Sequence, residues 1–274
     1  MELKIIFIYC FCSDFLNFLG IKSDPQSKMN QAEVMTVAIV AALFYGGNFS
    51  RARQVLMWTG HVQNMLSESR LNRKLHQIDF SIWNIAFKVI SKAFQQTDTS
   101  FDYLIDSMPV EVCANYRSYR CKLLKGKEFI GFCKAKKKFY YGFKLHLITL
   151  ANGLPIEFLI TPASIADITA FKMMEIDLPL NSTIYGDKAY NDYSFEDLLH
   201  EMCEIQLIPE RKINSKRQHS GCISFLHSRL RKRIETSFSQ INRLFPRKIE
   251  AVTAKGFLMK LLIFVFAFAL HNFL

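Results

Sequence analysis

The spacing of apolar residues changes near residue 95. Before that point apolar side chains recur at helical spacing, as in NQAEVMTVAIVAALFY (30–45), which is followed by the helix terminator Gly46-Gly47. After it, short runs of aromatic and β-branched residues alternate with helical stretches. The polar sequence QQTDTS (95–100) separates the two patterns. We therefore expect an all-helical region over residues 1–95 and a different region over residues 101–274.

The second region has the pattern of an α/β domain. Its expected order is strand, strand, strand, helix, strand, helix, strand and helix, which predicts a mixed sheet flanked by helices. The strands are expected at 103–110, 139–150, 154–164, 182–190 and 204–210, and the helices at 165–178, 193–203 and 224–245. In the last helix an apolar series three and four residues apart is expected to face the core. Its members are Leu226, Leu230, Ile234, Phe238, Ile241 and Phe245.

The charge of the chain favours a polyanionic partner. Of the 274 residues, 35 are Lys or Arg and 24 are Asp or Glu, a formal charge of +11, so nucleic acid is the first candidate. Residues 117–138 hold nine basic side chains and one acid, and residues 211–233 hold eight basic side chains and no acid. These runs suit a phosphate track, and the alternative is a solvated charged face.

The helical region carries a second basic group. Arg70, Arg73 and Lys74 lie three and four residues apart and share one helix face. A short helix, a tight turn and a basic helix resemble a helix-turn-helix, the common DNA-reading motif. An ordinary solvated helix face is the alternative.

Apolar runs at 5–12 and 261–270 are expected to be packed helices rather than a targeting signal or a membrane span. We therefore expect a cytoplasmic protein with no membrane partner. The seven cysteines form no CxxC pair, which fits a reducing compartment. A zinc site of Cys113, Cys121, Cys133 and His146 is conceivable, but the spacing fits no common pattern.

Three carboxylates border the expected core. Asp106 interrupts the apolar run FDYLIDSMPVEV, Asp187 ends the strand STIYG, and Glu235 follows Ile234 at the edge of the helical apolar face. A desolvated carboxylate gains a partner or protonates, and three that converge need cations between them. Oxygen ligands select Mg²⁺ or Mn²⁺, and two such ions promote in-line displacement at a phosphodiester. The alternative for each residue is a salt bridge with Lys or Arg.

The motifs resemble those of bacterial DDE transposases and are most similar to the insertion-sequence 982 family. The resemblance covers nearly the whole chain. It rests on SRLNRKLH (69–76), YLIDSMPVEVC (103–113), YYGFKLHLITLANGLPIEFLITPASIADITAF (140–171), YGDKAYNDY (185–193) and RKRIETSFSQINRLFPRKIEAVTAKGF (231–257).

The resemblance implies an RNase H-like catalytic core. In that core Asp106 lies on the first strand, Asp187 follows the fourth and Glu235 lies on a late helix, and together they hold two metal ions. Water then attacks the phosphodiester at the element end, and the released 3′-OH attacks target DNA. The alternatives are a non-catalytic DNA-binding protein from a decayed element and a nuclease with the same core.

Two features depart from the family pattern. Lys188 stands where the family commonly has a small residue after the second Asp. Around the Glu, Arg231 matches the expected Arg, whereas Ser228 and Asn242 do not match the wider signature.

The resemblance also implies partners: the terminal inverted repeats of the element, target DNA, and a second copy of the chain when two ends are joined. Asp167 is expected to be the N-cap of the helix that follows it, and His146 a satisfied core histidine. The side chains expected to contact DNA are Arg70, Arg73, Lys74, Lys136, Lys137, Lys138, Lys188, Arg231 and Lys232.

Overall fold

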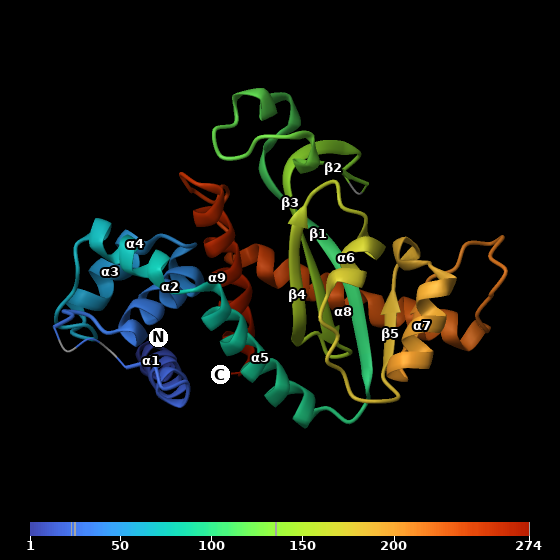
Figure 1. Ribbon diagram of the computed structural model, residues 1–274, viewed down its shortest axis with the longest axis horizontal. Coiled ribbons are helices and arrows are strands. Elements are labelled where there is room, and N and C mark those ends of the chain that lie inside the picture. Colours follow the sequence, from blue (N-terminus) through green and yellow to red (C-terminus); the bar gives the residue numbers. More distant parts are fainter. Residues whose placement is uncertain (23, 25, 135, 274) are drawn as a thin grey trace. The chain divides into compact units, whose positions relative to one another are not determined.

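The computed structural model describes residues 1–22, 24, 26–134 and 136–273 (Figure 1). The chain folds into two compact units, which we call the helical unit (residues 1–90 and 240–274) and the sheet unit (residues 91–239). The helices are α1 (Glu2–Phe18), α2 (Gln31–Tyr45), α3 (Phe49–Trp58), α4 (Glu68–Gln77), α5 (Phe80–Thr97), α6 (Asp167–Met173), α7 (Tyr193–Cys203), α8 (Gly221–Leu244) and α9 (Ala254–Phe273). The strands are β1 (Asp102–Ala114), β2 (Ile130–Cys133), β3 (Lys138–Leu150), β4 (Pro155–Pro162), β5 (Thr183–Gly186) and β6 (Gln206–Pro209), and short 3₁₀ helices are η1 (Asn115–Arg120), η2 (Lys127–Phe129) and η3 (Lys188–Tyr190).

The helical unit is built around α2 and α9, whose residues are mostly buried. Asn30 begins α2 with a capping box, because its side chain accepts from the Glu33 backbone while the Glu33 carboxylate accepts from the Asn30 backbone, each at 2.7 Å. Gly46 ends α2 in the left-handed conformation (φ +55°), which glycine adopts without strain. These local signals set the limits of the central helix.

The C-terminal helix α9 is long and apolar enough to cross a membrane, but 67% of its most apolar window is buried in the protein. All residues from Leu261 to Leu270 are buried, which confirms the prediction of a core helix there. The sequence pattern grouped residues 240–274 with the sheet region. They belong instead to the helical unit, because the apolar surface of α9 packs against α2.

The sheet unit contains a mixed sheet, as the sequence predicts, and the described residues form six strands where five were expected. The strand order is β2-β3-β1-β5-β6, with β4 also paired to β3. β1 runs antiparallel to β3 and parallel to β5, and β5 runs parallel to β6. Figure 1 shows α6 in front of the sheet and α8 behind it. Helices on both faces explain why β3 is buried along most of its length.

Three details differ from the sequence expectations. The sequence pattern did not indicate the short strand β2, whose four residues IGFC pair with the start of β3. In the predicted apolar series, Ile234, Phe238 and Ile241 are buried and Leu230 and Phe245 are half-buried, whereas Leu226 is 38% exposed. Asp167 is not an N-cap: Ala166 holds that position, and the Asp167 carboxylate turns to side chains of the sheet.

The close approach of β1 and β3 at their bulge depends on Gly142. A Cβ atom there would lie 2.2 Å from the Val110 carbonyl oxygen and 2.9 Å from the Val112 nitrogen, both backbone atoms that cannot rotate away. We predict that Gly142→Ala lowers the free energy of unfolding by about 2–3 kcal/mol, measured by urea denaturation. The matched control is Gly221→Ala, because nothing lies within 4 Å of a Cβ at that exposed helix position. Equal stability of the two variants would contradict this account of the bulge.

Candidate active site

The strand register brings Asp106 and Asp187 together. Ile105 of β1 pairs with Gly186, the last residue of β5, so Asp106 on β1 lies beside Asp187, the first residue after β5. Adjacent strands lie about 4.8 Å apart, and residues at the same level of a parallel pair face the same side of the sheet. Both aspartates are partly buried. Residues 81 positions apart in the sequence therefore form a pair of neighbouring carboxylates.

Asp106 is held in an environment that disfavours its charge. Burial raises its pKa to about 7, and the negative charges of Asp187 and Asp167 act in the same direction. The Ser107 backbone N–H, which donates to Oδ1 at 2.7 Å, and the Arg231 guanidinium oppose this shift. The desolvation of Asp106 exceeds what its present partners compensate. Such a carboxylate gains from a nearby cation.

Asp187 is fixed by the turn that follows β5. It caps η3 and accepts a hydrogen bond from the Ala189 backbone N–H at 2.8 Å. On the other side, the His227 ring Nε2 lies 2.6 Å from the Gly186 carbonyl oxygen, which can only accept, so Nε2 carries the proton. His227 is 5% exposed and lies on α8. This histidine, which the sequence pattern did not single out, fixes the end of β5 directly before Asp187.

Helix α8 closes a small space beside the two aspartates. The space is about 10 Å³, about the size of one water molecule. Its walls come from β1, β5 and α8: Leu104, Ile105, Asp106, Tyr185, Gly186, Asp187, His227, Arg231 and Ile234. Two carboxylates and one guanidinium thus border a space large enough for one small ligand.

Glu235, the third predicted ligand, does not border this space. Its side chain is 59% exposed, and its Oε1 lies 3.4 Å from the Arg231 Nε one helical turn earlier. In the part of the chain that the structure describes, no three His, Cys, Asp or Glu side chains are grouped closely enough to hold one metal ion. The structure therefore brings two of the three predicted carboxylates together and leaves the third on the adjacent turn of α8.

A fourth carboxylate, Glu210, extends the row. Gly186 pairs with Pro209 of β6, so Glu210 follows its strand just as Asp187 follows β5, and its backbone N–H donates to the Gly186 carbonyl at 2.8 Å. Its carboxylate contacts the Lys188 Nζ at 3.0 Å and the Arg231 Nη1 at 3.3 Å. Glu210 was not predicted from the sequence, although its place at the end of EIQLIPE is the same signal that marks Asp187.

Arg231 is the central cation of this face. It contacts Glu210 and Glu235, and its charge lowers the pKa of Asp106. Lys188, which departs from the family pattern, is 51% exposed and bound to Glu210. Both side chains predicted to contact DNA here thus form ion pairs with acids. A phosphate would compete with these acids for the two cations.

A second polar network lies behind Asp106, on the α6 side of β1. The Asp167 Oδ1 accepts from the Ser107 Oγ at 2.8 Å and from the Lys144 Nζ at 3.1 Å. His146 is fully buried and its Nε2 lies 2.9 Å from the Thr161 Oγ1; burial lowers its pKa to about 4. The histidine is neutral at physiological pH and lies in the core as expected, but its Nδ1 has no hydrogen-bond partner among the described residues, so only one ring nitrogen is satisfied. Asp167 thus fixes the residue next to Asp106 rather than capping a helix.

Tyr190 adds an unusual group to the site. Its side chain is fully buried in η3, and its hydroxyl has no hydrogen-bond partner among the described residues. Burial raises its pKa well above the usual value, and the charges of Asp106, Asp167 and Asp187 add to this effect. The hydroxyl is therefore a neutral donor in the neighbourhood of the three aspartates.

The predicted DNA contacts in the helical unit divide into two kinds. Arg70 and Arg73 are exposed on α4. Lys74 is partly buried, and its ammonium donates to the Met29 carbonyl at 2.9 Å and to the Ser27 hydroxyl, so it anchors the segment before α2. Helices α3 and α4 are joined by residues 59–67, a longer connection than the turn of about 3–4 residues in a helix-turn-helix.

The predicted contacts in the sheet unit are mostly exposed. Lys136, Lys137 and Lys232 are exposed, and Lys138 forms an ion pair with Glu111 at 2.7 Å. The basic run 211–233 is less uniform than its sequence indicates. Arg211 is buried against Glu196 (2.5 Å), and Arg217 pairs with Asp197 (2.6 Å). Arg211 is thus buried against α7, whereas Arg217 pairs with the same helix but is 46% exposed.

The cysteines do not form the zinc site that we considered. Burial raises the pKa of the Cys113 thiol to about 11, and the nearby Cys121 thiol acts in the same direction. No group of three potential metal ligands includes these cysteines or His146 within the described residues. Both thiols are free of disulfide bonds.

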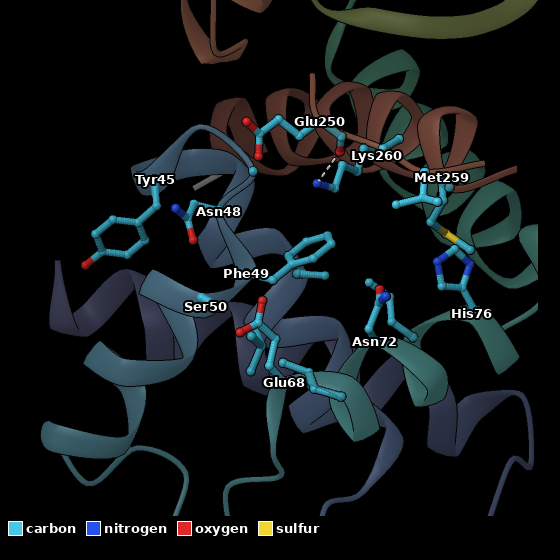
Figure 2. Close-up of a pocket in the computed structure, with 18 of the residues that line it drawn as sticks. Tyr45, Asn48, Phe49, Ser50, Glu68, Asn72, His76, Glu250, Met259 and Lys260 are labelled. Atoms are coloured by element: carbon cyan, nitrogen blue, oxygen red, sulfur yellow. Dashed lines mark hydrogen bonds between the residues drawn. The ribbon is translucent and has the colours of Figure 1, made fainter. Parts of the chain in front are cut away.

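A larger cavity of about 1160 Å³ lies within the helical unit. Figure 2 shows Phe49 and Glu68 on its walls, with Lys260 above the Phe49 ring and hydrogen bonded to the Glu250 backbone. The Lys260 ammonium lies 5.0 Å from the ring centroid, and burial lowers its pKa. Charged groups of both signs line this cavity, so its chemistry selects no single class of ligand.

A mixed sheet with neighbouring carboxylates beside its strands also occurs in metal-dependent enzymes that act on phosphodiesters. A family model described as "Transposase DDE domain" matches residues 96–252. The chain belongs to this transposase family. The match includes β1, β5, β6 and all of α8, and thus all four acids of the site. No curated protein and no solved structure matches the chain.

Transposases of this family generally use divalent metals. Two of the three predicted ligands are placed where they could hold such an ion, and the third is not. Asp106 and Asp187 offer hard oxygen ligands on neighbouring strands beside a space of about one water. Burial raises the pKa of Asp106, and the charge of Asp187 adds to this effect, so a cation beside Asp106 would favour its ionised form. Glu235 would have to leave Arg231 to join them.

The raised pKa of Asp106 makes a prediction for stability. Between the ordinary pKa of about 3.9 and the folded value of about 7, the folded protein binds more protons than the unfolded chain, so stability falls as pH rises through this range. Asp106→Asn removes the ionisable carboxyl group and with it this loss of stability at high pH. Without divalent ions, we expect it to raise the free energy of unfolding by about 1–2 kcal/mol at pH 8 and to have little effect at pH 4.

Urea denaturation at both pH values measures this effect. The matched control is Asp197→Asn, because the Asp197 carboxylate is exposed and its bond to Arg217 lowers its pKa. The control should not stabilise the protein at pH 8. An Asp106→Asn variant that is less stable than the wild type at pH 8 would contradict the assigned environment.

Proposed function

We propose that this chain is a DNA transposase of the insertion-sequence type, most similar to the insertion-sequence 982 family. It cleaves DNA at the ends of a mobile element and joins the released 3′-OH to target DNA. The single observation that carries the proposal is that Asp106 and Asp187 directly follow the paired residues Ile105 and Gly186 and border one small space, in a chain of the DDE transposase family. The sheet would then be an RNase H-like catalytic core, and the helices of residues 1–95 a DNA-binding region.

In this proposal Asp106, Asp187 and Glu235 hold two divalent ions, Mg²⁺ or Mn²⁺. Such ions supply the positive charge that activates an attacking oxygen and stabilises a leaving oxygen. The protein contributes the placement of the ligands. His227 fixes the end of β5, and Asp167 fixes Ser107, so the two aspartates sit on rigid supports. Asp106 must be ionised to act as a ligand, so activity should rise with pH toward neutrality.

Arg231 and Lys188 would bind the DNA phosphates. Both now contact Glu210, and Arg231 also contacts Glu235. When Arg231 binds a phosphate instead, the Glu235 carboxylate, one helical turn from Arg231, is released from its ion pair. This exchange would couple DNA binding to completion of the ligand set.

DNA is the partner that fits the charge of +11. The exposed Arg70 and Arg73 on α4 would contact the terminal repeats, and Lys136, Lys137 and Lys232 would contact the phosphate backbone. Joining two ends to one target calls for at least a dimer in the synaptic complex. The proposed location is the cytoplasm, at the nucleoid.

Cleavage tests the catalytic assignment directly. The protein is incubated with labelled element-end DNA and supercoiled target, with Mg²⁺ or with EDTA. We predict end cleavage and joined products for the wild type with Mg²⁺, and a loss of at least about a hundredfold in rate for Asp106→Ala. The matched control is Asp102→Ala, which removes another partly buried carboxylate from β1. Identical products from wild type and Asp106→Ala would show the assignment to be wrong, and cutting without joining would support a nuclease.

Metal binding can be measured without catalysis. We predict that saturating Mn²⁺ raises the melting temperature of the wild type, because an ion bound to the folded state alone stabilises it. Asp106→Ala and Asp187→Ala should lose this increase, and Glu210→Gln should keep it. An equal Mn²⁺ effect in the wild type and both aspartate variants would place the metal elsewhere.

A further inference from the structure

The connection between β1 and β3 forms a basic extension of the sheet, defined here as residues 115–134 and 136–139. Figure 1 shows it projecting beyond the ends of β1 and β3, with β2 at its base. It carries one acid, Glu128, and nine basic residues. The basic residues are Arg117, Arg120, Lys122, Lys125, Lys127, Lys134, Lys136, Lys137 and Lys138.

The extension is packed onto the sheet. Leu124 is only 3% exposed, and the Phe129 ring makes edge contacts with Tyr141 and Phe143, with centroids 6.0 and 5.4 Å apart. The Tyr141 hydroxyl donates to the Gly126 carbonyl at 3.0 Å. The side chains that remain exposed on the extension are therefore displayed from a fixed base.

Four aromatic rings are exposed on this extension. Tyr116 is 70% exposed, Tyr119 76%, Phe132 48% and Phe139 58%. Rings of this size are usually buried, and their gathering on one segment marks an interaction surface. Phe132 and Phe139 face each other across β2 and β3, with centroids 5.0 Å apart. The rings lie between the basic side chains both in the sequence and in the fold.

The 3₁₀ helix η1 repeats one unit twice. Its sequence NYRSYR places Tyr116 and Tyr119 three residues apart. Side chains three apart eclipse in a 3₁₀ helix, and the rise between them is about 6 Å. The Arg117 guanidinium lies 5.3 Å from the Tyr116 ring, and that of Arg120 lies 5.1 Å from the Tyr119 ring. η1 thus presents two successive pairs of a flat ring and a cation.

A ligand for this surface needs both negative charge and exposed flat faces. Duplex DNA supplies the charge, but its base faces are stacked inside the helix. An unpaired strand supplies both, because its bases can stack on protein rings while its phosphates contact Lys and Arg. We propose that the basic extension binds unpaired DNA, with Tyr116, Tyr119, Phe132 and Phe139 stacking on bases.

This inference rests on the proposed function only in taking DNA as the substrate. Along β1, Ala114 lies eight residues beyond Asp106, which is roughly 26 Å of extended strand. The extension is therefore separate from the carboxylates. Substitutions in it test DNA binding without altering the catalytic site.

The test compares single-stranded and duplex DNA of one sequence, each about 20 nucleotides long and fluorescein-labelled, by anisotropy with the full chain in EDTA. We expect Tyr116→Ala/Tyr119→Ala to weaken single-strand binding by about tenfold or more and duplex binding by less than about twofold. Phe132→Ala/Phe139→Ala should act in the same direction. Equal losses for both DNA forms would overturn the proposal, because they would reflect charge or folding rather than stacking.

Matched variants separate stacking from other contacts. Tyr116→Phe/Tyr119→Phe should bind the single strand as the wild type does, because it keeps both rings. Tyr116→Leu/Tyr119→Leu should lose binding as the alanine variant does. Met202→Ala removes a 76% exposed apolar side chain from α7 and should change nothing. Full single-strand binding by the leucine variant would overturn the proposal.

The two proposals fail separately. If the protein does not cleave element ends but its binding of single-stranded DNA still depends on the aromatic rings, the catalytic proposal is wrong and this one stands. A protein that cleaves element ends but binds single strands equally well with or without the tyrosines would do the reverse.

Discussion

The parallel pairing of β1 with β5 is the constraint on which the candidate site depends. Their register puts Ile105 beside Gly186, and the residue after each of them is an aspartate. A shift of one residue would turn one of the two side chains to the opposite face of the sheet. The neighbouring antiparallel pairing of β1 with β3 and the parallel pairing of β5 with β6 hold this register from both sides.

This register places two acidic side chains next to each other, which is electrostatically unfavourable. Two partly buried carboxylates lie side by side, and the pKa of Asp106 rises to about 7 because neither solvent nor protein fully compensates its charge. Arg231 compensates part of it, while also binding Glu210 and Glu235. The arginine thus balances acids on three elements, β1, α8 and the end of β6. In the proposed function this balance changes when DNA phosphates arrive, since they compete with the acids for the same guanidinium.

Much of this arrangement could be predicted from the sequence. Aromatic and β-branched runs located five of the six strands, and an aspartate inside such a run marked the site. β2 was missed because four residues beside a charged loop carry too little pattern. Glu210 was missed although it ends a strand pattern as Asp187 does, because only the register shows that the two residues lie side by side. Asp167 was misassigned because a local capping pattern could not show Lys144 and Ser107 nearby.

The position of Glu235 could not be predicted from the sequence either. The sequence indicated a ligand at this position. In the structure, however, the α8 residues that border the space beside the two aspartates include His227 and Arg231 and not Glu235. The central claim, that Asp106 and Asp187 form one cation site, is tested most directly by a crystal structure of the full chain grown with Mn²⁺. The account predicts an anomalous density peak between the two carboxylates. A peak bound to other residues, or two aspartates too far apart to share an ion, would contradict it.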